Sequence, residues 1–287
     1  MQAYLPLCTT ALHLTVKNYD EIINQASQLS PARLGACAIR ISIFPTIERT
    51  RAHSPYFVMN SPRYFALIPA AGVGARMGEK IPKQYVPIAG KPMLRRVLDT
   101  FSIAESVTHT FVVVSQDDAY IDTTLPVDRS HLTVLRVGGE TRHQSVLNGL
   151  HAIRSQVDDD DWILVHDAAR PGLTITLIDA LIYNLQDDEV GGLLAVPVVD
   201  TLKRSGSGGR VEQTVVRDHL WAAQTPQMFR YGLLRRALEQ SVTVTDEASA
   251  IEALGLRPKL VEGNPRNFKV TLPHDVALAE LYLKGLV

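Results

Sequence analysis

Short apolar runs alternate with stretches of helical periodicity from residue 64 onward. This alternation predicts an α/β fold of three layers, in which helices cover both faces of a mostly parallel, Rossmann-like sheet. Ligands of such sheets bind beyond the carboxyl ends of the strands, so the loops that follow strands are the first place to look for a site. The sequence predicts strands over Tyr64–Ile68, Thr110–Val114, Leu132–Val137 and Trp162–His166, and helices over Leu94–Ile103 and His143–Ile153.

One segment, about residues 198–220, departs from this alternation. Two β-prone runs, Thr201–Arg204 and Val211–Val215, flank the turn-forming stretch Ser205–Gly209, which predicts a β-hairpin. An isolated hairpin is marginally stable in water, so it needs a surface to pack on. That surface belongs either to a second subunit or to the hairpin's own domain, and the sequence leaves both arrangements open.

A glycine-rich loop directly follows the first predicted strand. It has the sequence Pro-Ala-Ala-Gly-Val-Gly-Ala-Arg-Met-Gly over residues 69–78, and Pro-Lys-Gln-Tyr follows at 82–85. Small residues such as Gly72 and Gly74 let the backbone approach an anion with its N–H groups pointing inward. Arg76 and Lys83 add two cations beside this loop. The pattern indicates a nucleoside triphosphate site in which cations stabilise charge at a reacting phosphate.

Other glycine-loop motifs fit poorly. A P-loop needs Gly-Lys-Ser/Thr at its end, whereas Gly78-Glu79-Lys80 has the wrong spacing and no hydroxyl. A dinucleotide fingerprint needs a third small residue where Met77 stands. A purely structural strand–turn–helix connection would explain the glycines but not the two cations.

At this point the chain resembles the nucleotidyltransferase family and, within it, the 2-C-methyl-D-erythritol 4-phosphate cytidylyltransferases of non-mevalonate isoprenoid synthesis. The glycine loop and Pro-Lys-Gln-Tyr carry the resemblance first, and it extends over roughly residues 63–285. The further motifs are Gly-Gly-Glu-Thr-Arg at 138–142, Val-His-Asp-Ala-Ala-Arg-Pro at 165–171, Asp-Thr at 200–201, Ala-Gln-Thr-Pro-Gln at 223–227, Thr-Asp-Glu-Ala-Ser at 245–249 and Lys-Val-Thr at 269–271.

The resemblance implies roles for individual residues. Arg76 and Lys83 would stabilise the transition state, because joining two anions requires positioning and charge compensation more than a strong nucleophile. Arg217 and Lys269 would hold the phosphate of the acceptor. The remaining implied residues contact the acceptor or the nucleotide: Thr201, Thr225, Asp167 and Arg170 for the acceptor, and the backbone of Ala70, Ala71 and Gly139 with Glu140 and Ser145 for the base.

The resemblance also implies a dimer and a metal. In the family the hairpin is an arm that crosses to a partner subunit, so we expect a homodimer in which Thr201 and Arg217 serve the partner's site. Mg²⁺ is expected with the triphosphate, held mostly by nucleotide and water, with Asp167 as the one protein ligand worth naming.

Three features favour a structural interpretation. His166 is expected to be a core histidine and not a general base, because the attacking phosphate is already ionised at neutral pH. Thr245 or Asp246 is expected to cap a helix, with a role in shaping the site left open. The four aspartates 158–161 are expected to form a solvated turn and not a metal site.

Composition agrees with a cytoplasmic enzyme. The formal net charge of −1 argues against general binding of nucleic acid or membrane surfaces. No apolar run approaches the roughly 18 residues that a bilayer span needs. The two cysteines, Cys8 and Cys37, both precede the glycine loop, so a disulfide framework is not expected.

Residues 1–58 lack the strand–helix alternation of the rest. We expect translation to start at Met59, with the upstream stretch an over-extended reading frame or a poorly ordered tail. A targeting peptide is the functional alternative. A secretory signal is disfavoured because the segment has no clean apolar core followed by small residues. The catalytic domain is therefore expected to span 59–287.

The resemblance implies transfer of CMP from CTP to 2-C-methyl-D-erythritol 4-phosphate. Two alternatives stay open at this stage. One is a related cytidylyltransferase acting on another polyol phosphate, such as ribitol 5-phosphate. The other belongs to a different class: a nucleotide-binding regulatory module without turnover, against which the two cations Arg76 and Lys83 argue.

Overall fold

The structure is a computed structural model that describes residues 62–72, 81–126, 128–241 and 244–284. All of these belong to the compact unit Asn60–Val287. The predictions for residues 1–58 and for the start at Met59 lie outside the described residues, as do those for Gly74 and Arg76.

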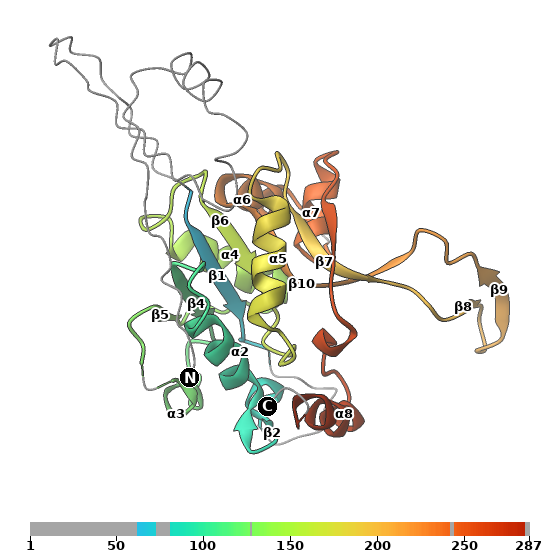
Figure 1. Ribbon diagram of the computed structural model, residues 1–287, viewed down its shortest axis with the longest axis horizontal. Coiled ribbons are helices and arrows are strands. Elements are labelled where there is room, and N and C mark those ends of the chain that lie inside the picture. Colours follow the sequence, from blue (N-terminus) through green and yellow to red (C-terminus); the bar gives the residue numbers. More distant parts are fainter. Residues whose placement is uncertain (1–61, 73–80, 127, 242–243, 285–287) are drawn as a thin grey trace, which may run out of the picture. The chain divides into compact units, whose positions relative to one another are not determined.

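The described residues contain a central sheet of seven strands. These are β1 (Tyr64–Pro69), β4 (His109–Val113), β5 (Leu132–Leu135), β6 (Trp162–Val165), β7 (Gly192–Pro197), β10 (Trp221–Arg230) and β11 (Lys259–Glu262). Their order is β11-β7-β10-β6-β1-β4-β5 (Figure 1). β10 alone runs antiparallel to its neighbours, and the other pairs in this sheet are parallel. The predicted mostly parallel sheet is confirmed.

Helices cover both faces of this sheet (Figure 1). The larger ones are α2 (Met93–Ser102), α4 (Arg142–Ala152), α5 (Ile175–Leu185), α6 (Tyr231–Gln240), α7 (Glu247–Ala253) and α8 (Pro273–Lys284). Shorter elements are η3 (Lys83–Tyr85), β2 (Pro87–Ile88), β3 (Lys91–Pro92), α3 (Ile121–Thr124) and η4 (Pro265–Asn267). No helix in the described part of the chain is long and apolar enough to cross a membrane.

The alternation of side chains along β1 shows why both faces are apolar. Phe65 and Leu67 pack into the cluster formed with α4, α6 and α7, whereas Ala66 and Ile68 pack into the cluster formed with α2 and α5. Successive residues of a strand point to opposite faces, so a strand covered on both sides must be apolar at every position. The continuous apolar run at 64–68 therefore encodes a central strand, as predicted.

The predicted elements lie within two residues of the observed ones. The helix expected at Leu94–Ile103 is α2, and the one expected at His143–Ile153 is α4. The strands expected at 110–114, 132–137 and 162–166 are β4, β5 and β6.

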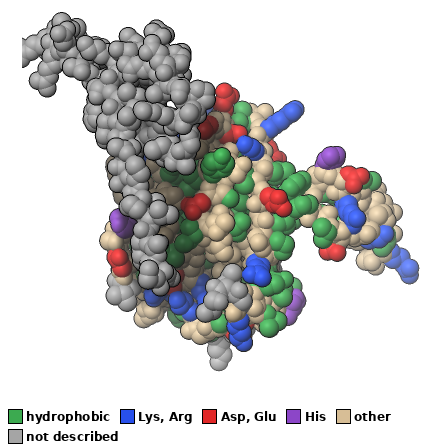
Figure 2. All heavy atoms as spheres, viewed as in Figure 1, with side chains coloured by type: hydrophobic (Ala, Val, Ile, Leu, Met, Phe, Trp, Pro, Cys, Tyr) green, Lys and Arg blue, Asp and Glu red, His purple; other side chains and the backbone are tan. Residues whose placement is uncertain are grey.

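The predicted hairpin is also present. β8 (Leu202–Ser205) pairs antiparallel with β9 (Val211–Val215), and the two form a separate sheet. This arm, residues 198–220, projects from the ends of β7 and β10, away from the central sheet (Figure 1). It is largely exposed, and Figure 2 shows basic side chains on it. The arm does not fold back onto its own domain.

The four aspartates at 158–161 are not uniformly solvated. Asp158 to Asp160 are exposed, but Asp161 is only 3% exposed. Its Oδ1 accepts hydrogen bonds from the backbone N–H (2.9 Å) and Nε (3.3 Å) of Arg63, and its Oδ2 accepts one from the Asp158 backbone N–H (2.8 Å). The expectation of a solvated turn was therefore wrong for Asp161. The buried carboxylate of Asp161 needs these hydrogen-bond donors, and by accepting from them it links the start of β1 to the turn before β6.

We predict that Arg63→Ala lowers the free energy of unfolding by about 1–2 kcal/mol, because the Asp161 carboxylate then keeps only backbone donors. Burial acts to raise the pKa of Asp161, but the hydrogen bonds from Arg63 and from the Asp158 N–H together outweigh it and lower the pKa. The contribution is therefore present at neutral pH and is lost as the pH falls through the folded-state pKa. Urea unfolding at pH 7 and at acid pH measures both effects.

Arg154→Ala is the matched control, because Arg154 pairs with Asp159 and both side chains are more than half exposed. Its expected effect is within about 0.5 kcal/mol. Equal losses in the two variants would contradict a special role for the Arg63–Asp161 pair.

Candidate active site

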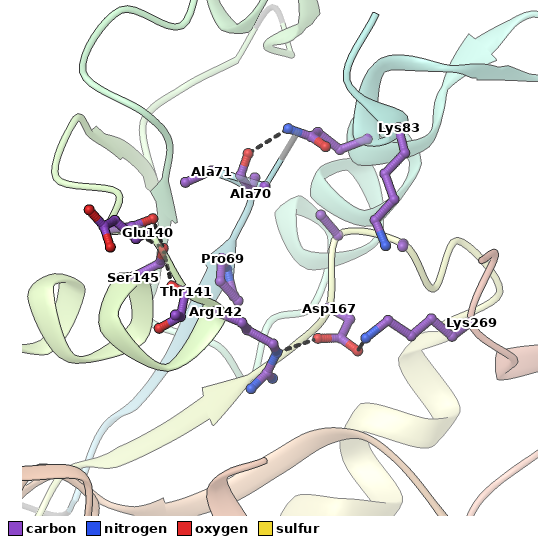
Figure 3. Close-up of a pocket in the computed structure, with 15 residues that line it drawn as sticks. Pro69, Ala70, Ala71, Lys83, Glu140, Thr141, Arg142, Ser145, Asp167 and Lys269 are labelled. Atoms are coloured by element: carbon purple, nitrogen blue, oxygen red, sulfur yellow. Dashed lines mark hydrogen bonds and ion pairs between the residues drawn. The ribbon is translucent and has the colours of Figure 1, made fainter. Parts of the chain in front are cut away.

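A cavity of about 240 Å³ opens where several strands end at the same edge of the sheet. It is lined by the end of β1, by η3, by the segment joining β5 to α4, by the loop after β6 and by Lys269 (Figure 3). The predicted residues that line it are Ala70, Ala71, Gly72, Lys83, Gly139, Glu140, Ser145, Asp167 and Lys269. Residues predicted from separate motifs thus meet at one place, as expected for the carboxyl edge of such a sheet.

Gln84 joins the end of β1 to the short helix that carries Lys83. Its buried amide Nε2 donates to the carbonyl oxygen of Ala70 (2.6 Å), and the N–H of Ala70 donates to the carbonyl oxygen of Val113 (2.7 Å). Both main-chain groups of Ala70 are therefore used within the protein, and its carbonyl keeps one lone pair for a ligand. The Lys83 side chain points from η3 into the cavity (Figure 3).

The amino terminus of α4 forms the opposite wall. Thr141 caps the helix by accepting from the Gln144 N–H (3.1 Å). Ser145 Oγ accepts from the Gly139 N–H (3.1 Å) and donates to the Thr141 carbonyl oxygen (2.9 Å). This end of a helix carries partial positive charge and favours an anion.

Gly138 lets the loop before α4 approach the loop after β1. A Cβ atom on Gly138 would overlap the Cβ of Ala71 and lie 2.8 Å from the carbonyl oxygen of Val114. Gly138 therefore allows close packing of two cavity-lining loops, whereas a Cβ on Gly139 would overlap the side chain of Gln144. That the backbone of Ala70, Ala71 and Gly139 reads a base stays a prediction.

Asp167 is the electrostatic centre of the cavity. It follows β6, its side chain is 9% exposed, and cations approach both of its oxygens. Arg142 Nε lies 2.8 Å from Oδ1, and Lys269 Nζ lies 2.9 Å from Oδ2 (Figure 3). Arg170 Nε lies 3.6 Å from the same Oδ2. Burial acts to raise the pKa of Asp167, but the positive charges of Arg142 and Lys269 outweigh it and hold the pKa well below its usual range.

Arg142 is a site residue to which sequence reasoning assigned no role. Besides Asp167 it binds Glu247, with its two terminal nitrogens 2.7 and 2.9 Å from the two carboxylate oxygens. Burial acts to lower the pKa of Arg142, but Glu247 and Asp167 raise it on balance. The sequence feature that could have indicated a site role for Arg142 is its place at the end of Gly-Gly-Glu-Thr-Arg, just after a strand.

Glu247 is held by its own helix start. Asp246 caps α7, accepting from the Ser249 N–H (3.0 Å), while Ser249 Oγ accepts from the Asp246 N–H (3.2 Å). The predicted cap is confirmed with Asp246 as the capping residue. Glu247, the first residue of α7, is only 1% exposed, and it fills the space between α7 and Arg142.

Arg170 and Thr225 lie behind the cavity and do not line it. The terminal nitrogens of Arg170 donate to the carbonyl oxygens of Asn267 (2.8 Å) and Ala223 (3.2 Å), and burial lowers the pKa of Arg170. Thr225 is 3% exposed and its hydroxyl oxygen accepts from the Asp167 N–H (3.0 Å). In this structure both residues support the loop that carries Asp167, and acceptor binding by either stays a prediction.

His166 is fully buried, as predicted for a core histidine. Its ring nitrogens contact the Thr225 hydroxyl (3.0 Å) and the Arg170 carbonyl oxygen (3.2 Å). Neither nitrogen faces the cavity, so the structure favours the core interpretation over a general base.

Thr201 and Arg217 are exposed residues of the arm, and neither lines the cavity of its own chain. The guanidinium of Arg217 donates to the carbonyl oxygen of Val199 at the base of the arm. A role for either in catalysis therefore requires another subunit or a movement of the arm.

The described residues do not form a ready-made metal site. Among them, no group of three or more His, Cys, Asp or Glu side chains converges. Asp167 would be the nearest candidate, but each of its oxygens already has a cation within 2.9 Å. This arrangement does not favour Asp167 as a ligand of Mg²⁺.

Comparison with known proteins agrees with this geometry. The family model described as IspD, 2-C-methyl-D-erythritol 4-phosphate cytidylyltransferase, matches residues 64–285. Enzymes of that name from Nitrosospira multiformis and Nitrosomonas eutropha are each 55% identical, over 77% of this chain and 98% or 97% of theirs.

Solved structures show the same fold. A crystal structure of 4-diphosphocytidyl-2C-methyl-D-erythritol synthase is 44% identical with a TM-score of 0.69, covering 77% of this chain and 98% of that one. The Francisella tularensis 2-C-methyl-D-erythritol 4-phosphate cytidylyltransferase is 35% identical with a TM-score of 0.66, covering 77% and 99%. The chain belongs to the 2-C-methyl-D-erythritol 4-phosphate cytidylyltransferase family.

Proposed function

We propose that the protein transfers CMP from CTP to 2-C-methyl-D-erythritol 4-phosphate. The products are 4-diphosphocytidyl-2-C-methyl-D-erythritol and pyrophosphate, in the non-mevalonate isoprenoid pathway. The observation that carries the proposal is the cavity itself, in which Lys83, Lys269 and the start of α4 surround one buried carboxylate in a chain of this family.

The reaction joins two anions. An oxygen of the acceptor phosphate attacks the α-phosphorus of CTP, that phosphorus–oxygen bond forms, and the bond to pyrophosphate breaks. Positive groups that are already in place lower the cost of bringing these charges together. Lys83 and the amino terminus of α4 are the described groups suited to the triphosphate, and Arg76 is proposed to join them.

The acceptor side is proposed to lie at Asp167 and Lys269. Asp167 is an acceptor of hydrogen bonds, which suits the hydroxyl groups of a polyol. Lys269 is about one-third exposed in its side chain, so its ammonium group can turn from Asp167 to a phosphate. Thr201 and Arg217 of a partner's arm are proposed to complete the phosphate site.

A related enzyme acting on ribitol 5-phosphate is the nearest alternative, because it would use the same CTP side of the cavity. A regulatory module without turnover is the alternative of another class. The family match over residues 64–285 supports the first proposal over both.

Mg²⁺ is proposed to reach the site with CTP. It would be held by phosphate oxygens and water, because the described residues offer it no free cluster of ligands. When bound, it would neutralise charge on the triphosphate. For the compartment we propose the cytoplasm, since the only cysteines, Cys8 and Cys37, precede the catalytic domain.

The arm is proposed to make a homodimer. It exposes apolar side chains that its own domain leaves uncovered: Val199 and Val216 are each 74% exposed, and Val211 is 64% exposed. An exposed hairpin with such side chains needs a partner surface. A second copy of the chain is the partner that the resemblance implies.

The substrate assignment predicts pyrophosphate release by the full chain with CTP, Mg²⁺ and 2-C-methyl-D-erythritol 4-phosphate, and not with ribitol 5-phosphate. Lys83→Ala is expected to lower kcat by about 10²- to 10³-fold, because it removes a cation beside the reacting phosphates. Lys91→Ala is the matched control, since Lys91 pairs with Asp99 on the surface.

Turnover with ribitol 5-phosphate alone would overturn the acceptor. CTP binding without turnover of either acceptor would favour the regulatory module. The same assay on protein begun at Met59 tests whether residues 1–58 are dispensable, and we expect equal activity.

The proposed dimer predicts that two inactive variants complement each other. Arg217→Ala and Lys83→Ala, co-expressed in equal amounts, should recover about a quarter of wild-type activity. About half of the dimers are then mixed, and one of the two sites in each mixed dimer has both residues. Co-expression that recovers no activity, in dimers shown to be mixed, would mean that the arm serves its own chain.

The metal proposal predicts that a chelator abolishes turnover and that Mg²⁺ restores it. Asp167→Asn should raise the KM for the acceptor about tenfold or more, because a charged hydrogen-bond acceptor is lost, and should leave the Mg²⁺ concentration needed for half-maximal rate unchanged. A large shift in that Mg²⁺ concentration would instead identify Asp167 as a ligand.

A further inference from the structure

Behind the cavity three hydrogen bonds join four groups in a series. The Asp167 backbone N–H donates to Thr225 Oγ1 at 3.0 Å. Thr225 Oγ1 lies 3.0 Å from His166 Nδ1, and His166 Nε2 lies 3.2 Å from the carbonyl oxygen of Arg170. This series of hydrogen bonds thus begins and ends on the backbone of the loop that holds Asp167 at the cavity.

The groups at the two ends of this series of hydrogen bonds determine which atoms in it carry protons. The Arg170 carbonyl can only accept, so the Nε2 that faces it must carry a proton. The Asp167 N–H can only donate, so Thr225 Oγ1 must accept from it. The Thr225 hydroxyl can still donate its own proton, and the nearby acceptor for that proton is His166 Nδ1.

The surroundings of His166 favour a neutral ring. The residue is 0% exposed, and its ring meets the ring of Phe101 edge-on at 5.8 Å. Burial lowers the pKa of His166 to about 4, and it outweighs the charge of Asp167 and the backbone hydrogen bonds of Arg170 and Thr225, which act to raise it. A charged ring would donate from Nδ1 to Thr225, and the described part of the chain records no other acceptor for the Thr225 hydroxyl proton.

We infer that His166 and Thr225 are positioning residues: a neutral His166, protonated on Nε2, accepts the Thr225 hydroxyl proton at Nδ1, and Thr225 thereby fixes the peptide of Asp167. The inference rests on the proposed function for its kinetic consequence only. It differs from a direct contact between Thr225 and the acceptor, because the Thr225 hydroxyl proton is committed to the interior. Thr225 then affects the acceptor through Asp167.

A spectroscopic measurement tests the proton positions without any turnover. In the full chain with ¹⁵N-labelled histidine at pH 7, the His166 ring should show a protonated Nε2 and an unprotonated Nδ1 that accepts a hydrogen bond. His166→Gln assigns the signal among the nine histidines by its disappearance. A proton on Nδ1, alone or together with one on Nε2, overturns the inference.

The kinetic test compares two substitutions of Thr225. Thr225→Val removes the hydroxyl at nearly constant volume, leaves the Asp167 N–H without its acceptor, and should raise the KM for the acceptor substrate about tenfold. The KM for CTP should stay within about twofold, because the CTP side of the cavity lies on other segments. Thr225→Ser keeps the oxygen and should restore the acceptor KM.

Each result has a definite meaning. Equal increases in both KM values, or a Thr225→Ser variant as impaired as Thr225→Val, would overturn the positioning role. If Thr225→Val does not fold, Thr225→Ser and the ¹⁵N measurement on the unmodified chain still decide it. If the unmodified chain turns over no acceptor, the proposed function fails, while the proton positions remain testable by the ¹⁵N spectrum.

Discussion

The buried carboxylate of Asp167 is the constraint on which the rest of the cavity depends. It follows β6 in the centre of the sheet, where an uncompensated charge would be strongly destabilising. Its cations arrive from different segments: Arg142 from the start of α4, Lys269 from the stretch after η4, and Arg170 from its own loop. The need to pair this one charge brings these segments together at the edge of the sheet.

This pairing also prepares the cavity for anions. In the absence of substrate, Asp167 and Glu247 keep Arg142 and its neighbours in fixed positions, because each cation has a carboxylate partner. Arg142, Lys269 and Arg170 thus share the carboxylates of Asp167 and Glu247, and Lys83 points into the cavity from the far wall. The cations around Asp167 are therefore already in place, and they need little reorganisation when a phosphate enters.

Much of this could be predicted from the sequence, for identifiable reasons. Continuous apolar runs gave the central strands, and residues directly after them, such as Asp167, had to lie at the carboxyl edge of the sheet. The sequence predicted no role for Arg142, because its partner Glu247 is 105 positions away. In sequence, an arginine in the first turn of a helix cannot be told from an ordinary surface residue. Arg170 and Thr225 were expected to contact the acceptor; here their side chains bond to backbone groups behind the cavity, and acceptor contact by either stays a prediction. Spacing alone does not say on which side of a loop a side chain lies.

β10 connects the arm to the cavity. The strand begins at Trp221, directly after the arm, and its pairing with β7 loses register between Ala223 and Gln227. The two residues next after Ala223, Gln224 and Thr225, bond outside the β7 ladder: the Gln224 side chain contacts Asn264 and Asn267, and the Thr225 hydroxyl holds Asp167. A regular strand would place these side chains against helices on one face or the other. The irregularity makes them available to the loops that carry Asp167 and Lys269, so the root of the arm and the support of the cavity are parts of one strand.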